Sequence, residues 1–166
     1  MKQIETEKKF IILKPDDNVI KAQEGFTESR IVQIYISDPE FTHRVRARRY
    51  GDRIEYTENT KKRISSMSSV ETEFEITEER FNELAEQIEP NSHPLRKRRV
   101  TFLSSGKTFE LDYYDFWEKT CVMEIELNSE AEHFNIPSFI NIVADVTDDK
   151  AYSNHTMAHK IPDELI

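Results

Sequence analysis

The chain has 166 residues, of which 37% are hydrophobic and 33% are charged, and its formal net charge is -9 at pH 7. This length fits one domain over 1–166 with a modest core. The acidic balance argues against nucleic acid as a partner, because nonspecific binding of nucleic acid requires a surplus of bases. The single cysteine, Cys121, excludes an internal disulfide framework and a cysteine-rich zinc site. No apolar run approaches the roughly 20 residues of a membrane-spanning helix, and the charged N-terminus is not typical of a signal peptide. We therefore expect a cytoplasmic protein without a membrane partner.

Alternation of polar and apolar residues dominates the chain and predicts β-strands. The pair Gly51–Asp52 is a turn signal that joins two of these segments in a hairpin. Because most connections are short, we expect the strands to be mainly antiparallel. In chain order, the predicted strands are 4–10, 29–37, 42–50, 53–64, 69–76, 95–103, 107–116 and 121–128.

Helical patterns are fewer. The clearest is 77–88, where Thr77 can cap the N-terminus and Phe81, Leu84, Ala85 and Ile88 form one apolar stripe. We expect further short helices at 15–25, at 129–134, where Ser129 and Glu132 have the spacing of a capping box, and in the apolar segment after Pro137. Eight strands with three or four helices predict an α+β protein.

Most of the predicted strands have one apolar face and one face that carries charges, since successive side chains of a strand point to opposite sides. Some strands carry only bases at these positions and others only acids. The bases are Lys9, Arg44, Arg46, Arg48, Lys61, Lys97 and Arg99, and the acids are Glu5, Glu7, Glu71, Glu73, Asp112, Glu124 and Glu126.

Two interpretations fit this segregation. The charged face is either the solvated side of a sheet, laced with salt bridges, or the interior of a closed eight-stranded antiparallel β-barrel with helices packed outside. A charged interior needs partners for its desolvated charges. Arginine suits the oxygens of a polyphosphate, and clustered carboxylates suit a hard divalent cation. Alternation alone leaves both interpretations open.

The segment IETEKKF carries the pattern ExExK, as Glu5, Glu7 and Lys9. With the motifs that follow it, the sequence resembles the CYTH domain of the triphosphate tunnel metalloenzymes, which include class IV adenylyl cyclases, thiamine triphosphatases and inorganic triphosphatases. The fold that this resemblance implies is an eight-stranded antiparallel β-barrel, the triphosphate tunnel. The later motifs are RVR (44–46), a lysine at 61 with Lys62 as its alternative, ETE (71–73), KRR (97–99), ELDYY (110–114), EIEL (124–127) and DVTDDKAYSN (145–154), in which Lys150 stands where an arginine is common.

The resemblance implies a role for each group of residues. Tyr35 matches a tyrosine that pairs with the ExExK lysine in inorganic triphosphatases of the family, so Lys9 and Tyr35 are the candidate catalytic pair; the alternative is that Tyr35 is an ordinary barrel residue. Mg²⁺ or Mn²⁺ would be bound by Glu5, Glu7, Asp112, Glu124 and Glu126, with Glu71 and Glu73 as supporting acids. The triphosphate would be bound by Lys9, Arg44, Arg46, Lys61, Lys97, Arg99 and Lys150.

We therefore expect a metal-dependent hydrolase of a triphosphate, with inorganic triphosphate as the leading substrate, followed by ATP or thiamine triphosphate. One alternative is a class IV adenylyl cyclase, which forms cyclic AMP from ATP. Another is a module that binds nucleotide or polyphosphate without turnover, although the full acidic set argues against it. The sequence leaves a homodimer open. The five histidines show no ligand spacing such as HExxH, so we expect no metal role for them.

Overall fold

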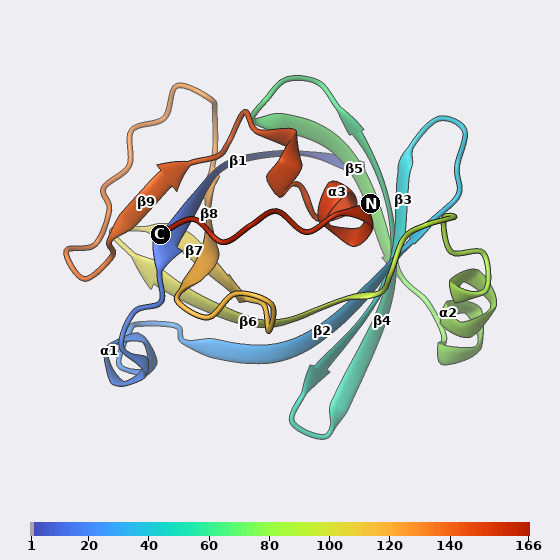
Figure 1. Ribbon diagram of the computed structural model, residues 1–166, viewed down its shortest axis with the longest axis horizontal. Helices are drawn as coiled ribbons and strands as arrows, with labels where there is room; N and C mark the ends of the chain where they lie inside the picture. The colour runs from blue at the N-terminus through green and yellow to red at the C-terminus, as the bar shows by residue number, and fades with distance from the viewer. Residues whose placement is uncertain (1) are drawn as a thin grey trace.

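The computed structural model describes residues 2–166 and contains nine strands and a few short helices (Figure 1). The strands are β1 (Lys2–Leu13), β2 (Thr27–Ile36), β3 (Thr42–Tyr50), β4 (Arg53–Arg63), β5 (Ser68–Glu75), β6 (Leu95–Ser104), β7 (Lys107–Tyr113), β8 (Thr120–Leu127) and β9 (Ile142–Asp145). The helices are α1 (Asp17–Lys21), α2 (Glu78–Ala85), the 3-10 turn η1 (Lys150–Tyr152) and α3 (Asn154–His159).

The sheet closes on itself. Its strand order is β5-β4-β3-β2-β6-β7-β8-β1-β9, every pairing is antiparallel, and β5 also pairs with the first half of β1. Eight strands thereby form a ring, and β9 extends it by pairing with the second half of β1. The prediction of an α+β protein built on an eight-stranded antiparallel β-barrel is confirmed.

Tight turns fix the register of the hairpins. Gly51, between β3 and β4, has a φ of 56°, and Ser105 and Gly106, between β6 and β7, both have positive φ. This left-handed backbone is what a two-residue hairpin turn requires, and glycine adopts it without a steric penalty. Residues 37–41 join β2 to β3, and there the side chain of Asp38 accepts hydrogen bonds from the backbone N–H groups of Glu40 and Phe41. The register of this pair places Arg44 opposite Tyr35 and Arg46 opposite Gln33. Residues opposite each other in an antiparallel pair share a face, so these four side chains point into the barrel.

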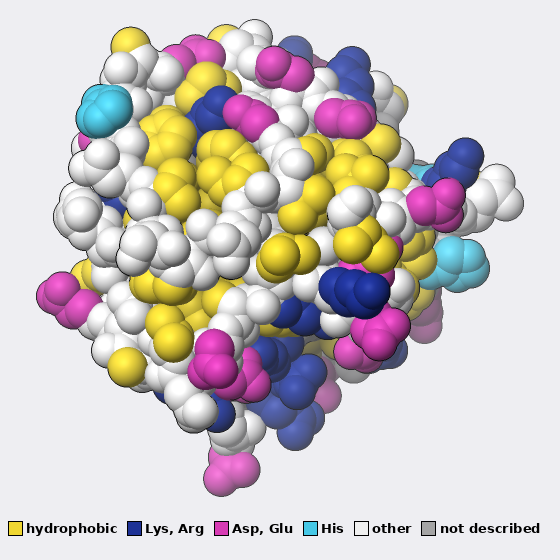
Figure 2. Space-filling view, turned by 60° about the vertical axis from the view of Figure 1, so that its left-hand side comes forward, with side chains coloured by type: hydrophobic (Ala, Val, Ile, Leu, Met, Phe, Trp, Pro, Cys, Tyr) yellow, Lys and Arg dark blue, Asp and Glu magenta, His cyan; other side chains and the backbone are white. Residues whose placement is uncertain are grey.

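Two segments cover the outside of the barrel. Helix α2, capped by Thr77, packs Leu84 onto Ile34 and Val45. The segment 128–141 covers other strands, where Phe139 and Ile140 join the largest apolar cluster. Figure 2 shows the side of the molecule that carries β9 and this segment, with apolar side chains gathered in its middle and charged groups around them.

The prediction of a helix at 129–134 is wrong. The carboxylate of Glu132 accepts hydrogen bonds from the backbone and side chain of Asn128 and pairs with Lys107. It therefore does not close a capping box with Ser129, and the segment makes irregular turns instead.

The C-terminal part of the chain folds across one end of the barrel, where η1 and α3 lie within the outline of the ring in Figure 1. The side chains of Asp149 and Ser153 cap these two helices in succession. Tyr152 and Met157 then pack against Tyr114 and Trp117 in an apolar cluster that also holds Ile11, Leu95 and Val122. On β1, Ile11 is the inward-facing position after Lys9, and on β8, Val122 is the inward-facing position before Glu124. The interior therefore changes from charged to apolar toward this end. None of the helices in residues 2–166 is long and apolar enough to cross a membrane.

Candidate active site

The barrel encloses a polar cavity of about 500 Å³. Fourteen of the side chains predicted from the sequence line it, which shows that the alternating charges form the interior rather than a solvated outer face. They are Glu5, Glu7, Lys9, Tyr35, Arg44, Arg46, Arg48, Lys61, Glu71, Glu73, Arg99, Glu124, Glu126 and Lys150.

The charges are segregated across the barrel. Arg44 and Arg46 lie on β3, whereas Glu124 and Glu126 lie on β8. Three strands separate β3 from β8 in either direction around the ring, namely β2, β6 and β7 on one side and β4, β5 and β1 on the other. The basic strand and the acidic strand therefore face each other across the cavity. A ligand that carries both anionic oxygens and a cation could contact both walls at once.

The basic side of the cavity, formed by Arg44 and Arg46 of β3 and called the basic wall below, has few hydrogen-bond partners. The Nε atoms of Arg44 and Arg46 are buried and have no hydrogen-bond partner within the described part of the chain. Arg46 makes one side-chain hydrogen bond, from Nη2 to Gln33 Oε1 at 3.1 Å. Burial and the neighbouring cations Arg44 and Arg99 lower the pKa of Arg46 to about 9. Unsatisfied buried groups are rare in folded proteins, and an anion in the cavity would satisfy these.

The opposite side of the cavity, called the acidic wall, is formed by closely spaced carboxylates. The pKa values of several of them are raised by burial and by a neighbouring carboxylate. Burial and a hydrogen bond with Glu71 raise the pKa of Glu5 to about 8, and burial and a hydrogen bond with Glu110 raise that of Glu126 to about 7. Burial and the charge of Glu124 likewise raise the pKa of Glu7. Each pair would repel if both members were ionised, so one proton holds it together. A divalent cation can take the place of such a proton.

Lys61 settles the choice between the two adjacent lysines of β4. Its Nζ lies 3.7 Å from a carboxylate oxygen of Glu5 and 3.7 Å from one of Glu71. Lys62 points outward and pairs with the exposed Glu40. Lys61 therefore points into the cavity beside two carboxylates, and its predicted contact with phosphate remains a prediction.

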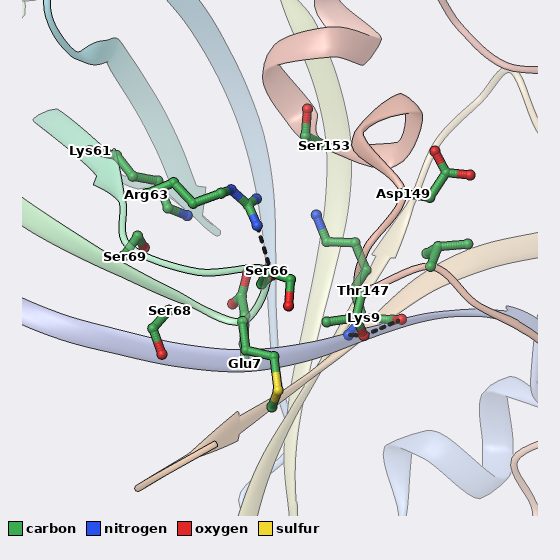
Figure 3. Close-up of a pocket in the computed structure, with 12 residues that line it drawn as sticks. Glu7, Lys9, Lys61, Arg63, Ser66, Ser68, Ser69, Thr147, Asp149 and Ser153 are labelled. Atoms are coloured by element: carbon green, nitrogen blue, oxygen red, sulfur yellow. Dashed lines mark hydrogen bonds between the residues drawn. The ribbon is translucent and has the colours of Figure 1, made fainter. Parts of the chain in front are cut away.

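A smaller cavity of about 30 Å³ adjoins the main one (Figure 3). The figure shows Lys61 and Arg63 on one side of it, Lys9 on β1, and Ser153 on the C-terminal segment. The guanidinium of Arg63 donates to the carbonyl of Ser66 at 2.7 Å and thereby holds the loop that forms the wall. Lys9, Lys61 and Arg63 line both cavities, so the two spaces share these bases.

Two predicted residues do not line the cavity. Asp112 was predicted to bind metal and Lys97 to bind phosphate, but they form a buried ion pair at 2.7 Å. Asp112 also accepts two hydrogen bonds from Arg99, at 2.7 and 2.8 Å. Although burial opposes it, Arg99 and Lys97 together lower the pKa of Asp112. The cross-strand pairing of Arg99 with Asp112 brings these charges together, so the protein itself neutralises the carboxylate.

Lys9 and Tyr35 both line the cavity, but each contacts other residues. Lys9 Nζ donates to the carbonyl of Tyr152 at 3.3 Å and lies 3.6 Å from Glu124. The Tyr35 hydroxyl accepts a hydrogen bond from Gln33 at 2.8 Å. Within residues 2–166, no hydrogen bond joins Lys9 to Tyr35. Their predicted pairing therefore remains a prediction.

Two residues of the site were missed. Glu110 is two positions before Asp112 on β7 and lies 2.6 Å from Arg99, so the alternation of the strand could have identified it. Gln33 is fully buried and links Arg46 to Tyr35. Because it carries no charge, the pattern of charged positions does not identify it.

Comparison with known proteins supports the fold. No family model matches the chain, and no curated protein matches it. Two solved structures of NE1496 are each 27% identical to this chain, with a TM-score of 0.58, and one of them is named as the inorganic triphosphatase. The first match covers 95% of this chain and 99% of NE1496, and the second covers 96% and 97%. HpAC1 from Hippeastrum, a proposed adenylyl cyclase that reveals a dominant triphosphatase activity, is 14% identical with a TM-score of 0.52. It covers 74% of this chain and 80% of its own.

A closed eight-stranded antiparallel barrel with opposed basic and acidic walls inside it is a triphosphate tunnel. The similarity to NE1496 over nearly the whole of both chains agrees with this class. The fold that the sequence motifs implied is therefore confirmed, and the likeness to NE1496 agrees with the resemblance of those motifs to the CYTH domain.

Proposed function

We propose that this protein hydrolyses a triphosphate in a metal-dependent reaction inside the barrel, with inorganic triphosphate as its leading substrate. The observation that carries the proposal is that Arg44 and Arg46 line a cavity of about 500 Å³ and that their buried Nε atoms have no hydrogen-bond partner within residues 2–166. Two buried N–H donors without a hydrogen-bond partner reduce the stability of the free protein, and phosphate oxygens would satisfy both of them. The naming of NE1496 as an inorganic triphosphatase supports the same reaction class.

The donor set on the acidic wall fits Mg²⁺ or Mn²⁺. These ions prefer oxygen ligands, and Mg²⁺ is usually held by one or two carboxylates together with substrate phosphates and waters. The pairs Glu5–Glu71, Glu7–Glu124 and Glu110–Glu126 each offer such a partial ligand set. We assign the metal to Glu5, Glu7, Glu124 and Glu126. Glu110 replaces Asp112, which was predicted as a metal ligand, as the acid that β7 contributes to this wall. When bound, the metal would neutralise phosphate charge and lower the pKa of a coordinated water.

The residues of the chain itself would bind and orient the substrate. Arg44 and Arg46 can each bind two phosphate oxygens with the planar guanidinium group. Lys61 lies between the two walls, and Lys9, beside Glu124, can donate to a phosphate oxygen on the acidic side. Asp112 would act by holding Arg99 in place. Phosphoryl transfer requires mainly positioning and charge stabilisation, which this arrangement can supply.

The lining of the cavity favours inorganic triphosphate over ATP and thiamine triphosphate. Among the described side chains that line it, Tyr35 and His155 alone are aromatic, and their rings contact each other with centroids 5.0 Å apart. A nucleotide base or a thiamine ring usually needs an apolar or aromatic surface for binding. The charged walls match a ligand that consists of phosphate alone.

The test is to measure phosphate release from inorganic triphosphate, ATP and thiamine triphosphate with Mg²⁺ or Mn²⁺, with cyclic AMP assayed in parallel. We expect the highest kcat/KM with inorganic triphosphate and no activity when a chelator removes the metal. Formation of cyclic AMP as the main product would favour the cyclase alternative. Absence of turnover with all three substrates would favour a binding module and contradict the proposal.

A further inference from the structure

A second cluster of potential ligands lies at the rim of the barrel, apart from the acidic wall. His155 and His159 of α3 both direct Nε2 toward one oxygen, Oε2 of Glu89, at 2.8 and 2.7 Å. Ligand atoms of the three residues all lie within 4.8 Å of one another, and residues 2–166 contain no other such group of three. We propose that Glu89, His155 and His159 form a binding site for a divalent transition-metal ion of the Zn²⁺ class.

The local structure explains why these residues meet. His155 and His159 are four residues apart, so they lie on the same face of helix α3. Glu89 follows α2, and its backbone N–H donates to the carbonyl of Tyr35 at 2.9 Å. The N–H of His93 donates to the carbonyl of Ala158 at 2.8 Å, which ties the segment after Glu89 to the end of α3. Backbone contacts therefore hold the carboxylate opposite the two imidazoles.

The chemistry of the cluster suits Zn²⁺ better than Mg²⁺. Two imidazole nitrogens and one carboxylate are a common set of protein ligands for zinc, and they leave a position open for water. The hard ion Mg²⁺ prefers oxygen ligands alone. The side chains are 39%, 35% and 18% exposed for His155, His159 and Glu89, so an ion can reach them from solvent. Without an ion, the Glu89 carboxylate would accept hydrogen bonds from the two histidines. A metal titration distinguishes the hydrogen-bonded cluster from the metal-bound one.

Metal in this cluster would act on the tunnel through α3. His155 lines the main cavity and packs against Tyr35, and Ser153, Asn154 and Thr156 line the same cavity. An ion that joins α3 to Glu89 would restrict the movement of this helix relative to β2. The inference does not depend on hydrolysis, because it concerns the attachment of α3 to the barrel.

The test is calorimetric titration of the metal-free protein with Zn²⁺ in excess Mg²⁺, which occupies the acidic wall. We expect one Zn²⁺ per chain, a rise in Tm on binding, and affinity at least about 10-fold lower in Glu89→Gln and His159→Ala, as expected when a ligand is lost. His133→Ala, which changes an exposed histidine elsewhere, is the matched control and should bind as the wild type does.

Two outcomes would overturn the proposal. One is that the wild type binds no Zn²⁺; the other is that Glu89→Gln and His159→Ala bind it as tightly as the wild type, which would place the ion on the tunnel carboxylates. A measurement without variants guards against misfolding: Co²⁺ bound to the wild type should show the visible absorption of a nitrogen-ligated, low-coordinate ion. The weak spectrum of octahedral, oxygen-ligated Co²⁺ would contradict the site.

Discussion

Two groups of buried charges lie inside the same barrel and differ in whether the protein neutralises them. Lys97, Asp112 and Arg99 form a paired set in which the Asp112 carboxylate accepts hydrogen bonds from both cations, and Arg99 also pairs with Glu110. Arg44 and Arg46, on β3, have buried Nε atoms without partners within residues 2–166. The two groups look alike in the sequence, since both are charges at alternate positions of a strand.

The difference suggests a division of labour. Charges that satisfy one another contribute to the fold, because removing one partner leaves the others buried and unpaired. Charges that remain unsatisfied reduce the stability of the free protein and are available to a ligand. The carboxylate pairs of the acidic wall belong to the second group, since each needs a proton to hold it together.

The largest effect is expected for Asp112→Asn. This change leaves Lys97 and Arg99 buried without an anion between them, so the free energy of unfolding should fall by about 3–5 kcal/mol, measured by denaturant titration. Glu126→Gln is the matched comparison on the acidic wall, and it should not destabilise the protein. If Asp112→Asn were as stable as the wild type, the division between the two groups would be wrong.

Arg46→Met should affect activity rather than stability. Loss of one preorganised donor to the transition state should lower kcat/KM for inorganic triphosphate by about 10²–10³-fold. The control is Arg49→Met, which removes an exposed, outward-pointing arginine from the same strand and should leave kcat/KM unchanged. Equal activity in the two variants would remove Arg46 from the substrate site.

The carboxylate pairs should make both stability and metal binding depend on pH. A carboxyl whose pKa is higher in the folded than in the unfolded protein stabilises the fold while it is protonated. For Glu5 this contribution is present below about pH 4.5 and is lost as the pH rises to about 8. The metal-free protein should therefore lose stability over this range.

Mg²⁺ should reverse this loss, because it binds the ionised pairs. At a concentration of about 100 times its Kd at pH 8, the ion should raise Tm by about 5–10 °C at pH 8, and the same concentration should raise it by less at pH 6, where binding is weaker. Thermal unfolding at the two pH values checks this prediction. A rise in Tm that is larger at pH 6 would contradict the replacement of shared protons by metal.

The smallest effect is expected for Lys150→Ala. Lys150 lines the cavity from η1, but it is exposed to solvent, where a single charge contributes only about 0–1 kcal/mol. The KM for inorganic triphosphate should therefore rise only a few-fold. A loss of activity as large as that of Arg46→Met would show that Lys150 is a main contact of the substrate despite its exposure to solvent.

Alternation predicted which residues of each strand point inward, because the period of a strand fixes the face of every side chain. It could not predict which charges neutralise each other. That depends on register, such as the pairing of Arg99 with Asp112. The alternation of charges along β7 could have predicted Glu110 as an inward-facing residue, whereas it could not identify Gln33, which is uncharged.

The part of the chain after residue 128 was predicted less well. The short strand β9 and helix α3 depend on contacts with distant segments, such as the pairing of Ile11 with Ala144. The four-residue spacing of His155 and His159 became informative once the structure showed that they lie on a helix. The convergence of Glu89 on them depends on the tertiary fold, because 66 residues separate it from His155.

The measurement that tests the central claim most directly is the thermal unfolding of the wild type and Arg46→Met, each with and without inorganic triphosphate and Mg²⁺. Without ligand, the Tm of Arg46→Met should be no lower than that of the wild type, because relief of repulsion from Arg44 and Arg99 offsets the lost hydrogen bond to Gln33. With ligand, the wild type should gain several degrees and the variant should gain little. An equal gain in both proteins, or no gain in the wild type, would contradict the claim that Arg44 and Arg46, whose Nε atoms lack partners within residues 2–166, bind the triphosphate.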